Sequence, residues 1–109
     1  MDPRVQHTID LLSDDLSHQC DIKTLAESVK LSPSRLRHLF KHETGYTPAQ
    51  YLKRLRLERA RELLDESFLR LKEVMPRVGL TDESHFVRDF KKTHGLSPIK
   101  YRNKSAGSN

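Results

Sequence analysis

The 109-residue sequence has no tryptophan, only four glycines and a single cysteine, Cys20. Cys20 therefore has no partner for an internal disulfide and cannot build a thiolate zinc site alone. No run approaches the ~18 consecutive apolar residues of a transmembrane helix. No apolar stretch follows the first charged residues, as a signal peptide would require. These absences predict a cytoplasmic protein that has no membrane contact and no covalent crosslink.

Hydrophobic residues make up 35% of the chain, which is enough for one small helical domain. Lysine and arginine together number 20 against 15 acidic residues, for a formal net charge of +5. The excess is uneven, because residues 1–21 carry Arg4 against five aspartates. The positive charge after residue 21 favours an anionic partner.

Apolar residues recur with a period of about 3.6, and no segment shows the alternation of a strand. The pattern and its capping residues predict an all-α fold of seven helices. Their expected ranges are 3–18, 22–29, 33–44, 48–65, 70–78, 82–94 and 98–104. We expect a domain over 1–104, with subdomains at about 4–46 and 69–104, a linker helix at 47–66 and a disordered tail at 105–109.

An internal repeat organises these helices. A shift of 50 residues aligns seven pairs of similar punctuation and core residues: Ser34 with Ser84, Leu36 with Phe86, Phe40 with Phe90, Lys41 with Lys91, Gly45 with Gly95, Pro48 with Pro98, and Tyr51 with Tyr101. Upstream the best shift is 49, and the one-residue difference falls in the turn before the third helix. Each copy reads as helix, short turn and helix, which is typical of a helix-turn-helix. Solenoids usually need three or more copies.

The second helix of each copy exposes matching donors. With Leu36 and Phe40 facing the core, the helical period places Ser34, Arg37, His38 and Lys41 on the opposite side. The corresponding set in the second copy is Ser84, Val87, Arg88 and Lys91. An arginine can meet guanine O6 and N7 bidentately in the major groove, and a lysine suits the phosphate backbone. The alternative is a pair of ordinary solvated helix faces.

Other candidate sites are weaker. Lys53 and Arg54 lie on a helix that also carries several acids, so phosphate contact and ordinary helix pairing are equally open. His38 and His42 have a spacing that suits one metal, but no further ligands are evident, so no metal or other cofactor is expected. No phosphate loop, nucleophile elbow or carboxylate pair is present, which argues against an enzyme.

The second copy resembles the signature of AraC/XylS-type transcription regulators. The residues that carry the resemblance are Leu71-Lys72-Glu73-Val74, Val78-Gly79-Leu80, Ser84-His85-Phe86, Arg88, Phe90-Lys91-Lys92, Gly95, Ser97-Pro98 and Tyr101-Arg102. Leu31-Ser32, Leu36, Leu39-Phe40-Lys41 and Gly45 resemble the first helix-turn-helix of the same domain. Together they extend the resemblance over about residues 5–102.

The resemblance implies a bacterial transcription activator in which two recognition helices, held by a long fourth helix, enter adjacent major-groove segments on one face of DNA. Base-facing positions fall on Ser34, Arg35, Arg37, His38, Glu83, Ser84, His85 and Arg88. Phosphate contacts are expected from Lys41, Lys53, Arg54, Lys91 and Lys92. Arg35 and His85 lie towards the side of their helices, where phosphate contact is an alternative.

A long helix between the two heads also predicts how they are used. About 18 helical residues give roughly 27 Å of rise, which approaches one turn of DNA once the heads are added. We therefore expect a monomeric domain on an asymmetric operator, with RNA polymerase as a further partner. The length fits a natural single-domain regulator and an excised C-terminal part equally.

Met75 and Pro76 in the predicted fifth helix depart from the family pattern, and Pro76 is expected to kink or shorten that helix.

The sequence also leaves other functions open. The alternative function is a basic helical module that binds an acidic protein, such as a polymerase subunit. Binding of single-stranded nucleic acid or RNA is a weaker alternative, because no exposed aromatic platform for base stacking is evident.

Overall fold

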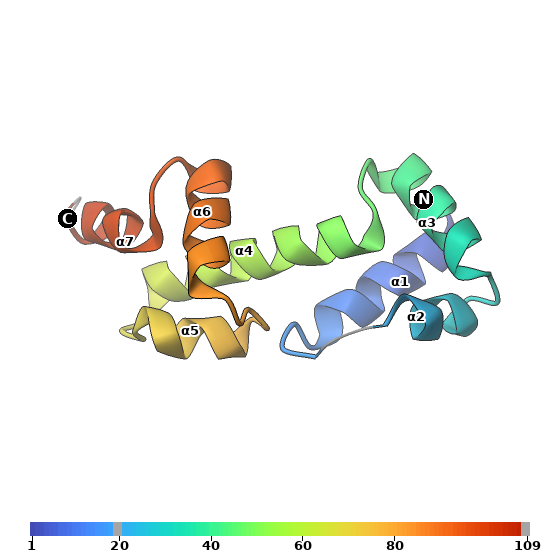
Figure 1. Ribbon diagram of the computed structural model, residues 1–109, viewed down its shortest axis with the longest axis horizontal. Coiled ribbons are helices and arrows are strands. Elements are labelled where there is room, and N and C mark those ends of the chain that lie inside the picture. The colour runs from blue at the N-terminus through green and yellow to red at the C-terminus, as the bar shows by residue number, and fades with distance from the viewer. Residues whose placement is uncertain (19–20, 108–109) are drawn as a thin grey trace. The chain divides into compact units, whose positions relative to one another are not determined.

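The computed structural model describes residues 1–18 and 21–107, so Cys20 lies outside the described residues. Within them every regular element is an α-helix, which confirms the all-α prediction (Figure 1). The helices are α1 (Pro3–Asp14), α2 (Ile22–Ser28), α3 (Pro33–Thr44), α4 (Pro48–Glu66), α5 (Leu71–Arg77), α6 (Glu83–His94) and α7 (Pro98–Gly107). None of the helices in this described part is both long and apolar enough to cross a membrane.

The predicted caps begin the helices. The Asp2 carboxylate accepts a hydrogen bond from the Arg4 backbone N–H at 2.8 Å, and Asp21 accepts one from Lys23 at 3.1 Å. At the start of α4 the Thr47 hydroxyl accepts from the Gln50 N–H at 3.2 Å, while the Gln50 side chain accepts from the Thr47 N–H at 3.0 Å. This reciprocal pair satisfies two backbone donors that a helix start leaves open.

Two helix ends differ from expectation. Helix α1 stops at Asp14 instead of continuing to residue 18, because Asp15 adopts an extended backbone and accepts bonds from the Ser17 N–H and hydroxyl. Such local bonding competes with the helix. Helix α7 runs through Gly107, so the backbone of residues 105–107 is helical where a disordered tail was predicted. Each added residue there extends an existing helix and needs no new nucleus. Residues 108–109 lie outside the described part.

The chain divides into two compact units, Met1–Leu55 and Arg56–Asn109, with the boundary inside α4. The core of the first unit is formed by buried apolar residues of α1, α2, α3 and the first part of α4. These are Val5, Leu12, Leu25, Ala26, Leu36, Phe40 and Leu52. The Phe40 ring also meets the Tyr51 ring edge to face, with centroids 5.3 Å apart.

The second unit repeats this arrangement with later elements. Its core residues come from the second part of α4, α5 and α6, and they are Leu57, Ala60, Leu64, Val74, Met75, Val78, Phe86 and Phe90. The Phe90 and Tyr101 rings form the same edge-to-face pair, with centroids 5.6 Å apart. The aromatic residues aligned by the shift of 50 are therefore structurally equivalent.

The proline in α5 does not shorten the helix. Helices α2 and α5 both have seven residues, and Val29 and Val78 follow them as C-caps. Pro76 lies in the last turn of α5, so it removes only the bond to the carbonyl of Lys72, an exposed residue. The turn after α5 is one residue longer than the turn after α2, which accounts for the change in repeat shift from 49 to 50.

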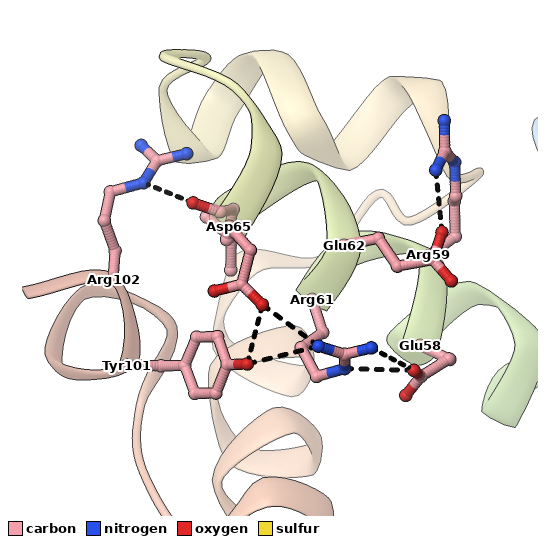
Figure 2. A network of polar contacts seen from close by, with 8 residues as sticks. Glu58, Arg59, Arg61, Glu62, Asp65, Tyr101 and Arg102 are labelled. Atoms are coloured by element: carbon pink, nitrogen blue, oxygen red, sulfur yellow. Dashed lines mark hydrogen bonds and ion pairs between the residues drawn. The ribbon is translucent and has the colours of Figure 1, made fainter. Parts of the chain in front are cut away.

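A polar network joins α4 to α7 within the second unit (Figure 2). Arg61 lies between Glu58 and Asp65 and donates to both carboxylates, and its Nη1 also donates to the Tyr101 hydroxyl at 3.3 Å. The Tyr101 hydroxyl in turn donates to Asp65 at 2.9 Å. The hydrogen bond from Arg61 lowers the pKa of Glu58. Arg102 extends the network by donating to the carbonyl of Leu64 at 3.2 Å, near the end of α4 (Figure 2).

Candidate nucleic-acid interface

Helix α3 presents the predicted donors of the first unit. The Ser32 hydroxyl accepts from the Arg35 N–H at 3.2 Å, and Pro33 occupies the first helical position. Leu36 and Phe40 are fully buried and fix which side of α3 faces the core. The remaining sides carry the exposed residues Ser34, Arg35, Arg37, His38 and Lys41. A rigid, capped helix therefore holds several hydrogen-bond donors towards solvent.

Helix α6 has the same construction in the second unit. Asp82 replaces Ser32 as the cap and accepts from the His85 N–H at 2.9 Å, which lowers the pKa of the Asp82 carboxyl. Phe86 and Phe90 are buried at the positions of Leu36 and Phe40. The residues left exposed are Glu83, Ser84, His85, Arg88, Lys91 and Lys92.

The two helices differ in charge near their starts. In α3 the first turns carry Arg35 and Arg37 and no acid, whereas α6 begins with Asp82 and Glu83 ahead of Arg88. The His85 ring lies 3.6 Å from the Asp82 carboxylate, and Arg88 also acts electrostatically on it. The start of α3 is therefore the more attractive of the two for an anion, while α6 offers both donors and acceptors.

Lys53 and Arg54 lie on the first part of α4, and both side chains are exposed. The Arg54 guanidinium stacks over the Tyr46 ring, with Cζ 4.7 Å from the ring centroid. This contact restrains Arg54 at the surface of the first unit. The sequence does not reveal the stacking, because periodicity within α4 says nothing about the loop before it.

All of the predicted contact residues are exposed, and the structure gathers them in two groups, one in each unit. The first group is on α3 and the start of α4, and the second is on α6. Periodicity predicted the buried side of each helix, and the burial of Leu36, Phe40, Phe86 and Phe90 confirms it. Whether each exposed residue touches a base or a phosphate stays a prediction.

A hollow beside α3 is a feature that sequence reasoning missed. It has a volume of about 500 Å³, and its lining includes Arg4 from α1 together with Arg35, His38 and His42 from α3. Nothing in the sequence pairs Arg4 with α3, because the two are far apart along the chain. Among the described residues, no group of three or more His, Cys, Asp or Glu side chains is placed to hold a metal ion.

The chain that carries these two capped helices, each behind a short turn, is similar to known proteins. A protein-family model described as a helix-turn-helix domain matches residues 25–104. The C-terminal domain of AraT, a response regulator from Geobacillus stearothermophilus, has a TM-score of 0.85 and 31% identity, covering 94% of this chain and 85% of that one. The chain belongs to the AraC-type helix-turn-helix family.

Two further comparisons agree with this AraC-type assignment. The arabinose operon regulatory protein of Salmonella typhimurium is 37% identical over 103 residues, covering 94% of this chain and 37% of the relative. The DNA-binding domain of AdpA, solved in complex with a target DNA, has a TM-score of 0.89 and 26% identity, covering 97% and 96% of the two chains. The AraC-type chain thus spans about a third of the length of the curated relatives it matches.

Proposed function

We propose that this AraC-type domain binds double-stranded DNA in a sequence-specific way and thereby regulates transcription, with α3 and α6 each entering a segment of the major groove. One observation carries the proposal: two separate units present the same capped helix with the same buried face and with exposed donors on the other sides. The AdpA domain, which shares the fold, was solved with its target DNA. Two similar reading helices in one chain suit two successive sites on a duplex.

The roles follow from the geometry of each side chain. Arg37 and Arg88 are exposed on sides away from the core and have the fork of donors that guanine O6 and N7 accept, worth roughly 1–3 kcal/mol of discrimination each. Ser34, His38, Glu83 and Ser84 add shorter or accepting groups near the helix starts. Lys41, Lys91 and Lys92 are placed further along the helices, where we expect sequence-independent attraction to phosphates.

Selection of bound sequences from a random duplex pool tests the proposal first. We expect one recurring asymmetric site with two conserved segments, because α3 and α6 carry different residues. Recovery of no preferred sequence would contradict sequence-specific binding. A competition titration with excess random DNA at physiological salt separates the alternatives, since any basic domain binds DNA weakly at low salt. If the random DNA displaces the selected duplex completely, the result favours the alternative function, binding to an acidic protein.

The selected site then separates base contacts from phosphate contacts. Arg37→Ala and Arg88→Ala should each lose preference at a different base position, by roughly 1–3 kcal/mol. Lys41→Ala should weaken selected and random duplexes by the same factor. The assignment of roles is wrong if all three variants lose the same affinity on both duplexes. Circular dichroism of each variant checks that the exposed substitutions leave the fold intact.

The wider setting is also part of the proposal. Relatives at 29–35% identity are named as a transcriptional activator and a lactose operon transcription activator, so we infer activation rather than repression. Contact with RNA polymerase and a cytoplasmic location follow from that function.

We further infer subdomains at about 4–46 and 69–104, a linker helix at 47–66 and binding of the isolated domain as a monomer. Footprinting that shows one short protected segment would contradict a two-headed monomer.

A further inference from the structure

The hollow beside α3 collects positive charge from two helices. Its polar lining consists of the Arg4 and Arg35 guanidiniums, the His38 and His42 imidazoles and the Ser34 hydroxyl, with Leu31 and Leu39 as apolar lining. No carboxylate occurs among these lining residues. All four basic side chains belong to exposed residues, so a large ligand has access to them. The chemistry of the hollow therefore suits an anion with several acceptor oxygens.

Arg4 is held in place on its side of the hollow. Its Nε donates to Asp2 Oδ1 at 3.1 Å and its Nη2 donates to Asp2 Oδ2 at 2.9 Å. The Asp2 backbone N–H donates to Glu43 Oε1 at 2.7 Å, which ties the start of α1 to the end of α3 (Figure 1). Since a guanidinium has five N–H donors, the bonds to Asp2 leave donors for a ligand. The Asp2 carboxylate is at the same time a competitor for Arg4.

The position of the hollow on α3 indicates which part of a bound duplex it would face. With Leu36 as the reference, Arg37 and Lys41 lie at about 100° and 140° around the helix, whereas His42 and Arg35 lie at about 240° and 260°. The hollow is therefore on the flank of α3 opposite Arg37. A recognition helix in the major groove has one DNA strand along each flank, and a strand offers a phosphate at every nucleotide.

We propose that this hollow seats one backbone phosphate of the DNA strand that runs along the Arg35 side of α3, held jointly by Arg4 and Arg35. The proposal rests on the proposed function, because it requires α3 to lie in the groove. It adds Arg4 of α1 to the DNA contacts and moves Arg35 from base reading to phosphate binding. His38 and His42 also line the hollow.

Salt dependence of binding gives the first test, with the selected duplex and a random duplex as probes. Arg4→Gln and Arg35→Gln should each weaken both duplexes by the same factor and reduce the slope of log K against log salt by about 0.9. Arg4→Lys should keep the slope, because it keeps the charge. Arg59→Gln is the matched control, since Arg59 is paired with Glu62 at 2.7 Å as Arg4 is with Asp2, but lies outside the hollow.

A gain of affinity gives the second test. Asp2→Asn keeps a residue type that caps helices well and removes the carboxylate that competes for Arg4. It should tighten binding to both duplexes severalfold. Asp10→Asn is the control of equal charge change, because Asp10 is on α1 but bonds to Gln6 and does not line the hollow. We expect a clearly smaller effect from it.

Several outcomes would overturn the phosphate seat. An unchanged salt slope in Arg4→Gln, a changed base preference in Arg35→Gln, or equal effects of Asp2→Asn and Asp10→Asn would each exclude it. Thermal unfolding of every variant separates a lost contact from a lost fold, and Arg4→Lys covers the case in which Arg4→Gln unfolds. These results leave the proposed function standing if the wild-type domain still selects its site. If the wild type selects no sequence, the proposed function fails first.

Discussion

At the residue scale, Lys30 and Gly79 occupy the same place in the two turns that precede α3 and α6. Both have a positive φ, 58° for Lys30 and 76° for Gly79. The next residue closes each turn, with the Leu31 N–H bonded to the Ala26 carbonyl at 3.0 Å and the Leu80 N–H to the Met75 carbonyl at 2.9 Å. This left-handed cap suits glycine, whereas a side chain at such a position meets a steric penalty.

Lys30→Gly should therefore stabilise the first unit. Relief of the left-handed strain, about 1–2 kcal/mol, exceeds the extra entropy of glycine in the unfolded chain, so we expect a gain of about 0.5–1 kcal/mol in the free energy of unfolding. Urea denaturation measures it, and the mirror variant Gly79→Lys should lose a similar amount. A loss of stability in Lys30→Gly would show that the Lys30 side chain contributes more than its backbone costs.

At this scale the predictions from the sequence were correct where they depended on the period of a single helix. The period of α3 alone puts Leu36 inside and Arg37 outside, and both placements are confirmed. It failed where two elements meet, because periodicity does not say which residue of α1 comes beside α3. Arg4 was missed for that reason. The end of α1 was wrong because Leu16 fits a helical period, yet the bonds from Ser17 to Asp15 turn the chain before it.

At the element scale, the internal repeat includes one more pair of helices than the aligned residues show. Helix α1 buries Val5, Thr8 and Leu12, and the second part of α4 buries Leu57, Ala60 and Leu64 with the same spacing. Each unit thus consists of a supporting helix, the two helices of the helix-turn-helix and a closing helix. Alignment missed the supporting helices, because they share only the spacing of buried positions and have no common glycine, proline or aromatic residue.

The closing helices differ in how their tyrosines are used, which gives a prediction at this scale. Tyr101→Phe keeps the ring pair with Phe90 but removes the hydroxyl bonded to Asp65 and Arg61, so the free energy of unfolding should fall by about 1 kcal/mol. Tyr51→Phe is the matched control, since no hydrogen bond of the Tyr51 hydroxyl is found among the described residues. Chemical denaturation compares the two, and equal losses would contradict a stabilising role for the network.

At the scale of the whole molecule, the two hydrophobic clusters share none of their described residues, and the boundary between the units falls within α4. Leu52 belongs to the first cluster and Leu57 to the second, although both are on one helix. The sequence predicted two heads from the repeat, with α4 as the helix that joins them. Buried residues of α4 contribute to both clusters, so this helix also supplies part of each core.

Separate cores predict separate unfolding. Phe90→Ala removes a fully buried ring from the second cluster and should cost that unit about 3–5 kcal/mol, more than a unit of this size can spare. Amide hydrogen exchange should then lose protection in α5, α6 and α7, while α1, α2 and α3 keep theirs. Phe40→Ala should give the reverse pattern, since Phe40 is equally buried in the first cluster. In footprinting of the selected duplex, each variant should protect only the DNA segment that its remaining folded recognition helix contacts. Loss of protection throughout the chain in either variant would mean that α4 couples the two cores into one cooperative unit.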